Sequence, residues 1–239
     1  MSNIQISEME KDALGEVMNI SMGSAATAVS ELLSAKVWIT TPRVEIVKAD
    51  DMLRYDKLEP AVCVKIEYVK GLSGNNLMVL RQDDVQMILN QLMGQPLEVT
   101  PDFEFDELNI SAVSEVMNQM MGASSTALSD FLGRVVNIST PETFDGSDVE
   151  TVRSQWLPVQ QGPIIVVQFA LKIEGSMESE FMNIMPVELA KELVSGFGLG
   201  ENEDSSHVIE QSAEPSAGGK NLSQSQIEAM LAAQNRSEE

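Results

Sequence analysis

Two segments of the chain place a carboxylate and a carboxamide three residues apart inside an otherwise apolar stretch. EVMNISMG supplies Glu16 and Asn19, and EVMNQMMG supplies Glu115 and Asn118, each shifted by 99 residues. A carboxylate suits a cationic partner, whereas a neutral carboxamide can hold a water molecule through a donor and an acceptor without repelling an anion. The two pairs are therefore candidates for one chemical site that occurs twice.

Two long helices are predicted to carry these pairs, and their sequences repeat. SEMEKDALGEVMNISMGSAATAVSELL (7–33) matches DELNISAVSEVMNQMMGASSTALSDFL (106–132). Both segments begin with acidic residues, which suit the positive end of the helix dipole. Self-similarity at a fixed shift indicates an internal repeat, so each pair is expected at the same place in a repeated unit.

A narrow polar stripe is expected along each helix. At about 100° per residue, Asp12 falls within roughly 60° of the first pair, and Ser111 takes the same place beside the second pair. Gly23 and Gly122 extend each stripe by one turn, at a cost of about 1 kcal/mol of helix propensity each. The apolar neighbours of both stripes are predicted to face the core: Val17, Ile20, Val116 and Met120.

A solvated helix face is the ordinary explanation of a Glu-x-x-Asn pair, and gene duplication could copy an idle pair into both helices. Two details favour a site. Asn is a poor mid-helix residue because its side chain competes for backbone hydrogen bonds, yet it occurs in both copies. In addition, 22 residues separate Asn19 from Pro42 and Asn118 from Pro141 alike, whereas other distances within the repeats drift.

The rest of each half also follows one order, with three strands and a second, amphipathic helix. AVCVKIEYV and PIIVVQFALKI alternate as strands do, and each is followed by a glycine and another short strand. Strands joined by short glycine-containing turns are most easily antiparallel. We therefore predict one α+β domain over residues 1–200, with halves of about 1–100 and 101–200. A pseudo-two-fold axis is expected to relate these halves, which share one largely antiparallel sheet with the long helices packed on it.

The composition changes after residue 200. Residues 201–221 carry charge, Ser, Gly and Pro without an apolar period, which predicts a disordered linker with His207 exposed to solvent. Residues 222–234 predict a short helix, because Ser223 and Gln226 form a capping box. Its apolar residues are Leu222, Ile227, Met230 and Leu231. Two interpretations stay open: a frayed or incomplete helix, or a tethered peptide that docks in a groove of a partner protein.

Charge and cysteine content narrow the function classes. A net charge of −22 argues against nucleic acid or anionic lipid as the main partner, because binding either needs Lys and Arg to neutralise phosphate. Cys63 is the only cysteine, so no intrachain disulfide can form and a reducing compartment is expected. One His and one Cys cannot build a soft metal site, and the longest apolar run is too short to span a bilayer. Without a secretory signal pattern, the chain is predicted to be cytoplasmic.

The combined pattern resembles the signature of the CheC/FliY/CheX family of chemotaxis phosphatases. It reads Asp or Ser, three residues, Glu, two residues, Asn, 22 residues, Pro, and it occurs from Asp12 to Pro42 and from Ser111 to Pro141 without a departure. The resemblance implies the pseudo-symmetric fold of that family and its activity, dephosphorylation of the aspartyl phosphate of the response regulator CheY. The alternative is a scaffold or adapter that binds CheY or other chemotaxis proteins without catalysis.

The resemblance also implies a role for each matched position. Asn19 and Asn118 would orient the attacking water, and Glu16 and Glu115 would contact a lysine of the regulator. Four further residues would support these sites without taking part in the chemistry: Asp12, Ser111, Pro42 and Pro141. Mg²⁺ is expected on the regulator, and no cofactor is expected on this chain itself.

The tail segment LSQSQIEAML is similar to the segment of flagellar switch proteins that binds phosphorylated CheY. A phosphatase domain joined to such a segment resembles the FliY branch of the family more than free-standing CheC. This resemblance implies a place at the cytoplasmic face of the flagellar basal body, with FliM, FliG or the deamidase CheD as further candidate partners. Members of that branch normally also have a switch domain like FliN and are expected to hold the peptide at the N-terminus, so this arrangement departs from theirs.

Overall fold

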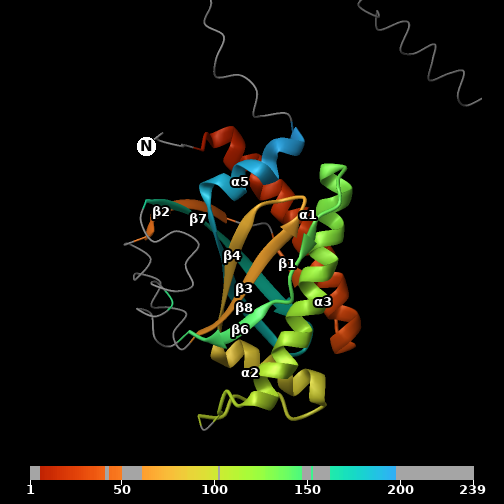
Figure 1. Ribbon diagram of the computed structural model, residues 1–239. Helices are drawn as coiled ribbons and strands as arrows, with labels where there is room; N and C mark the ends of the chain where they lie inside the picture. The colour runs from red at the N-terminus through yellow and green to blue at the C-terminus, as the bar shows by residue number, and fades with distance from the viewer. Residues whose placement is uncertain are drawn as a thin grey trace, which may run out of the picture. The chain divides into compact units, whose positions relative to one another are not determined.

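The computed structural model describes residues 6–40, 43–49, 61–101, 103–146, 152 and 162–197. The first half runs through α1 (Glu8–Leu33), β1 (Val37–Ile39), β2 (Arg43–Lys48), β3 (Ala61–Lys70), β4 (Gly74–Arg81) and α2 (Gln82–Met93). The second half runs through α3 (Glu107–Leu132), β5 (Asn137–Ile138), β6 (Glu142–Asp145), β7 (Pro163–Ile173), β8 (Met177–Pro186) and α5 (Val187–Val194), with a 3-10 turn at Ser195–Phe197. Both halves follow the same order, which confirms the predicted α+β fold with an internal repeat (Figure 1).

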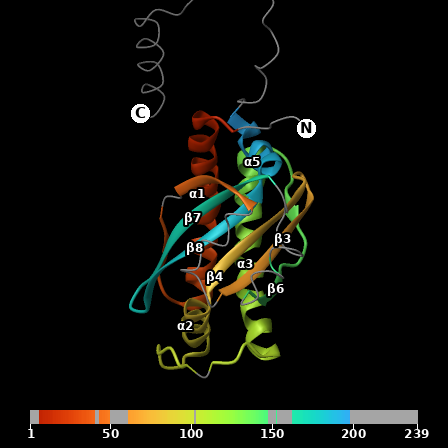
Figure 2. The ribbon, with the colours of Figure 1, turned by 90° about the vertical axis from the view of Figure 1, so that its left-hand side faces the viewer.

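One antiparallel sheet contains the strands of both halves, in the order β1-β7-β8-β4-β3-β5. In addition, β2 pairs with β7 and β6 pairs with β3. Each half thus places its first two strands beside the third strand of the other half, so neither half completes the sheet alone. Helices α1 and α3 pack side by side across one face of this sheet and run in opposite directions (Figures 1 and 2).

The repeat axis passes through the centre of the sheet, where β4 pairs with β8. Met78 lies opposite Asn183, and each of these residues precedes the following helix by four positions. The flanking pairs are Leu77 with Ile184 and Val79 with Met182. A two-fold axis between Met78 and Asn183 requires this register, because it exchanges the two flanking pairs. The predicted pseudo-two-fold relation is therefore built into the strand pairing.

Each half contains four strands, and the prediction of three was wrong. The proline-containing segment forms two short strands in both halves. β1 ends at Ile39 and β2 begins at Arg43, while β5 and β6 flank the buried Pro141. A proline has no backbone N–H to donate to a strand ladder, so it interrupts the strand. As a result, β5 and β6 pair with two separate stretches of β3.

Local signals fix the start of each long helix where the sequence predicts it. Ser7 Oγ accepts a hydrogen bond from the Glu10 N–H at 3.2 Å, and the Glu10 carboxylate accepts one from the Ser7 N–H at 2.7 Å. The Asp106 carboxylate accepts a hydrogen bond from the Asn109 N–H at 2.8 Å. Caps of this kind typically stabilise a helix by about 1 kcal/mol. The first turns of α1 and α3 are therefore held in helical geometry.

The inner faces of α1 and α3 form the core together with the sheet. Val17, Val116 and Met120 are buried there, as predicted. Ile20 is 40% exposed, so the prediction that it faces the core was wrong. It follows Glu16 by four residues, and residues at this spacing share one side of a helix. Ile20 therefore belongs to the outer surface of α1, beside the polar stripe.

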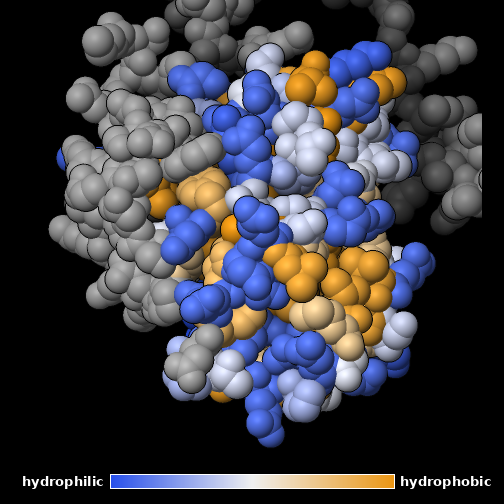
Figure 3. Space-filling view, turned by 60° about the horizontal axis from the view of Figure 1, so that its bottom comes forward, coloured by the Kyte–Doolittle hydropathy of each residue, from blue (hydrophilic) through white to orange (hydrophobic). Residues whose placement is uncertain are grey.

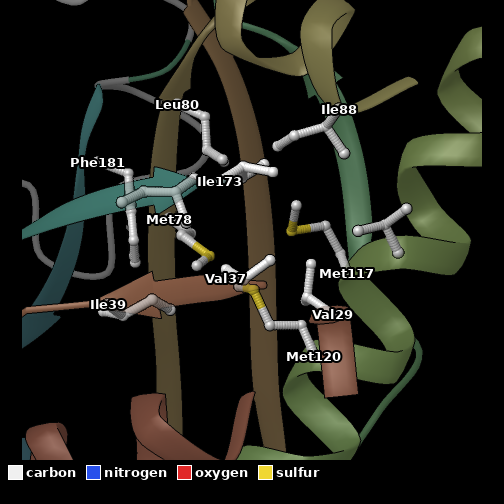
Figure 4. A pocket seen from close by; sticks show the side chains of 12 residues that line it. Val29, Val37, Ile39, Met78, Leu80, Ile88, Met117, Met120, Ile173 and Phe181 are labelled. Atoms are coloured by element: carbon white, nitrogen blue, oxygen red, sulfur yellow. The ribbon is translucent and has the colours of Figure 1, made fainter. Parts of the chain in front are cut away.

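A small cavity remains between the sheet and the two long helices. Met78 and Phe181 from the sheet and Met117 and Met120 from α3 converge on it (Figure 4). All of its lining residues are apolar. A cavity with apolar walls offers a water molecule no hydrogen-bond partner. This space is therefore a feature of core packing, and it is unsuited to a phosphorylated ligand.

Cys63 lies in β3 and is buried in the apolar cluster on the sheet face opposite the helices. Burial, together with the negative charge of Asp145, raises the pKa of its thiol to about 12. Because the thiolate is the reactive form, we expect Cys63 to react with Ellman's reagent at pH 8 only after unfolding. Labelling of the native protein as fast as that of the urea-unfolded protein would contradict this expectation.

Candidate functional site

The two polar stripes lie on the outer faces of α1 and α3. Within the predicted pairs, Glu16, Glu115 and Asn118 are exposed and Asn19 is half-buried. The residues one turn earlier are also exposed: Asp12 and Ser111. Each predicted trio is thus brought together along one helix, and the two trios belong to the packed antiparallel helix pair.

Most of these side chains have no partner among the described residues. Five of the six make no hydrogen bond or ion pair with the described residues: Asp12, Glu16, Asn19, Ser111 and Asn118. The structure therefore does not use these polar groups to stabilise its own fold. They are accessible, fully or in part, to another molecule.

The two sites differ beside the glutamate. Gln119 Nε2 donates a hydrogen bond to Glu115 Oε1 at 2.9 Å, one turn further along α3. The matching position in α1 is Ile20, which has no donor. A partner's cation would therefore share Glu115 with Gln119, whereas it would meet Glu16 without this competing neighbour.

A repeated hydrogen bond ties each long helix to the segment that follows it. The Val37 N–H donates to Ser30 Oγ, and the Val136 N–H donates to Ser129 Oγ, both at 2.9 Å. Each serine also donates to the carbonyl four residues earlier in its helix. These bonds orient both helices against the sheet in the same way. Sequence analysis missed the two serines, although they recur at the 99-residue shift.

The strand after each proline packs against its helix one residue before the glutamate. In the second half, Ser114 Oγ and Thr143 Oγ1 form a hydrogen bond of 3.0 Å, close to the buried Pro141. In the first half, Gly15 and Val44 take these places, and a methyl group on Gly15 would lie 4.0 Å from Val44 Cγ2. In the second half, the spacing from Asn118 to Pro141 thus lets the strand after the proline return along α3. A supporting role for the prolines stays a prediction.

Gly23 and Gly122 leave open space at the end of each stripe. A methyl group built on either glycine would meet nothing within 4 Å, so internal packing does not require glycine there. Thr27 and Thr126 donate hydrogen bonds to the carbonyls of these glycines at 3.1 and 3.0 Å. A helix surface without side chains at this point suits the close approach of another molecule.

The charges on the two helices favour a cationic partner. α1 contains five acidic residues and one basic residue, and α3 contains three acidic residues and no basic one. Such a surface attracts a lysine-bearing partner and repels an anion that arrives without a counter-ion. The stripes therefore suit a positively charged group presented by a protein.

The described residues offer neither a metal site nor a membrane-spanning helix. Across the described ranges, no group of three or more His, Cys, Asp or Glu side chains could hold a metal ion. No helix in those ranges has the length and apolar character needed to cross a membrane.

Six residues that the sequence analysis singled out lie outside the described residues: Pro42, His207, Leu222, Ile227, Met230 and Leu231.

Comparison with known proteins matches both copies of the repeat. Residues 9–46 and 108–144 match the CheC-like family, and these ranges run from α1 into β2 and from α3 into β6. The flagellar motor switch phosphatase FliY of Bacillus subtilis is 35% identical over 208 residues, which is 86% of this chain and 53% of that protein. The CheY-P phosphatase CheC of the same organism is 26% identical over 139 residues, which is 57% of this chain and 66% of that protein.

The fold places the chain in a class of pseudo-symmetric α+β domains in which two long helices pack on one antiparallel sheet. The crystal structure of Thermotoga maritima FliY superimposes with a TM-score of 0.73 at 36% sequence identity, covering 82% of this chain and 98% of that one. The chain belongs to the CheC-like family. It spans about half the length of B. subtilis FliY and about two-thirds of B. subtilis CheC.

Proposed function

We propose that the chain hydrolyses the aspartyl phosphate of phosphorylated CheY at two helix-borne sites. The observation that carries this proposal is the repeated Glu/Asn pair, whose side chains project from α1 and α3. All of them except Glu115 make no hydrogen bond or ion pair with the described residues. Relatives named as phosphatases, one of them a CheY-P phosphatase, support the reaction class.

The proposed chemistry needs little more than placement of water. An aspartyl phosphate is already a reactive acyl phosphate. Water attacks phosphorus in line, the bond from phosphorus to the aspartyl oxygen breaks, and aspartate and inorganic phosphate leave. The Asn19 or Asn118 carboxamide would hold the water through a donor and an acceptor while adding no negative charge beside the phosphoryl group. The proton that the water loses goes to the departing phosphate or to solvent.

The glutamates would place the helix on the regulator. Glu16 and Glu115 are exposed anionic groups one turn before the asparagines, and each suits an ion pair with a lysine beside the phosphoryl group. Such a contact fixes where the asparagine carboxamide enters the active site of the regulator. Its role is positioning, because the glutamate itself stays away from the attacking water.

In the proposed reaction, Mg²⁺ is bound by the substrate, phosphorylated CheY. Its site would be on the regulator, where it neutralises charge on the phosphoryl oxygens. We therefore expect the chain to leave free acetyl phosphate intact, even with Mg²⁺ present. The small molecule brings neither the lysine nor the metal ligands that the proposed reaction takes from the regulator.

A place at the flagellar motor switch is the finer part of the proposal. Similarity to a protein named flagellar motor switch phosphatase supports it, as does the tail segment LSQSQIEAML. In this proposal the tail captures phosphorylated CheY near the phosphatase domain and raises its local concentration. FliM, FliG and CheD remain further candidate partners.

The direct test adds the chain in trace amounts to phosphorylated CheY with Mg²⁺ and follows inorganic phosphate. We expect many turnovers per molecule of the chain, and no release from acetyl phosphate alone. Binding of phosphorylated CheY without faster phosphate release would instead identify a scaffold, and it would reject the catalytic proposal.

A further inference from the structure

Two exposed apolar side chains stand in line with the proposed sites. Met9 is 65% exposed and Leu108 is 70% exposed, the two highest values for large apolar side chains in the described part of the chain. They are separated by 99 residues, which is the shift that relates the two Glu/Asn pairs. An exposed apolar residue alone needs no explanation, but a matched pair beside two matched sites does.

The helix geometry puts each apolar residue on the same stripe as its Glu/Asn pair. Met9 precedes Glu16 by seven residues, and Leu108 precedes Glu115 by seven. Seven residues make two helical turns, so the two side chains lie within about 20° of each other and roughly 10 Å apart along the axis. A partner that contacts the glutamate and asparagine therefore faces the apolar residue as well.

The first helical turn holds these side chains outward. Met9 and Leu108 are the second residues of α1 and α3, two positions after the capping residues Ser7 and Asp106. The caps hold the backbone of this turn in helical geometry, and both side chains are exposed from it. The apolar surface is thus presented in a fixed position, as an interface that buries it would need.

The repeat has kept the apolar character while other residues diverged. Met9 in one half is Leu108 in the other, so the residue changed but remained large and exposed. On the flank of the same stripes, Ile20 corresponds to the polar Gln119. Passive copying by duplication does not account for this difference between the two positions.

The exposed apolar residues of α2 and of the segment after it lack this relation to the sites. The end of the molecule nearest α2 shows apolar side chains among charged ones (Figure 3). Met93, Leu97 and Val99, in α2 and the segment after it, are 43%, 37% and 46% exposed. None of them lies on α1 or α3, so they are outside both stripes.

We propose that Met9 and Leu108 are apolar anchors that bury against the surface of CheY when the Glu/Asn pair of the same helix enters its active site. This inference rests on the proposed function. It assigns each site an apolar contact about two turns before the glutamate, and it requires the regulator to present an apolar surface roughly 10 Å from its active-site lysine. The anchor contributes to binding and not to the placement of water.

The test isolates one site at a time. Met9→Gln is combined with Asn118→Ala, which leaves the first site intact, and Leu108→Gln is combined with Asn19→Ala. We expect each substitution to raise KM for phosphorylated CheY about tenfold with kcat unchanged, the loss typical of one buried apolar side chain. In the exchanged combinations, Met9→Gln with Asn19→Ala and Leu108→Gln with Asn118→Ala, the substitution falls on the helix that has lost its asparagine. The KM of the remaining intact site should then be unchanged.

Val69→Gln is the matched control, because Val69 is 60% exposed but lies on β3. It should leave KM and kcat unchanged in either background. Unaltered KM in both Met9→Gln and Leu108→Gln would overturn the inference, and so would a fall in kcat at unchanged KM. Failure of the proposed function gives a different result, since phosphate release would then persist at the wild-type rate in the Asn19→Ala, Asn118→Ala double variant.

Discussion

Replacing Asn19 and Asn118 together by alanine should reduce phosphate release from phosphorylated CheY by at least about 100-fold, to near its spontaneous rate. In the proposed mechanism the carboxamide is the group of this chain that holds the water in line with the phosphorus. Its loss removes placement without removing the glutamate contact, so binding should persist. Steady-state phosphate release measures the loss of activity, and a binding titration with phosphorylated CheY measures the retained affinity.

Single and charge-changing variants sharpen this prediction. Each single alanine variant should keep the activity of the other helix, since the two sites are separate copies. Asn19→Asp with Asn118→Asp preserves side-chain shape but places a carboxylate against the phosphoryl group, so we expect a loss as large as that of the alanine pair. Full activity in the alanine pair would show that the asparagines do not place the water.

Gly71→Ala should lower the free energy of unfolding by about 3 kcal/mol or more. Gly71 lies in the turn between β3 and β4 with φ of +83°, and an added Cβ would lie 2.2 Å from the carbonyl oxygen of Val135. The substitution thus combines left-handed backbone strain with a clash against the segment that leads into β5. Urea unfolding followed by circular dichroism gives the free energy.

The corresponding turn of the second half supplies the control. Gly175 joins β7 to β8 with φ of +74°, but an added Cβ there would meet nothing within 4 Å. Gly175→Ala should therefore cost only the backbone strain, about 1 kcal/mol. Equal losses in the two variants would show that the contact between Gly71 and Val135 does not constrain the fold.

Local signals made the helices predictable from sequence. Ser7 and Asp106 are capping residues, and they begin α1 and α3 at the residues that the pattern indicates. The repeat predicted the pseudo-two-fold relation, because two copies of one unit in a single sheet are most simply related in this way. These features depend on neighbours in the chain or on a shift that the sequence displays.

Long-range features were not predictable in the same way. The strand break around Pro141 was missed because two short strands and one irregular strand have similar sequence patterns. The exchange of β1 and β2 for β5 and β6 between halves depends on pairing partners that lie between 67 and 136 residues away in the sequence. No periodicity within one half reports such a partner.

The site was visible in part. Residue type and spacing singled out Glu16 and Asn19, because a polar pair is conspicuous in an apolar helix. Met9 was not noticed, since an apolar residue in a first turn has the same sequence pattern as a core residue. Only its exposure in the structure separates the two cases, and the same is true of Ile20.

The decay of phosphorylated CheY in a single turnover, with this chain in increasing excess, measures directly whether the two Glu/Asn sites accelerate hydrolysis. If the two Glu/Asn sites place the attacking water, the decay constant rises with concentration to a plateau far above spontaneous decay. The Asn19→Ala, Asn118→Ala variant should then bind phosphorylated CheY yet leave its decay at the spontaneous value. A wild-type plateau equal to spontaneous decay, at concentrations where binding is complete, would show that the two sites do not catalyse hydrolysis.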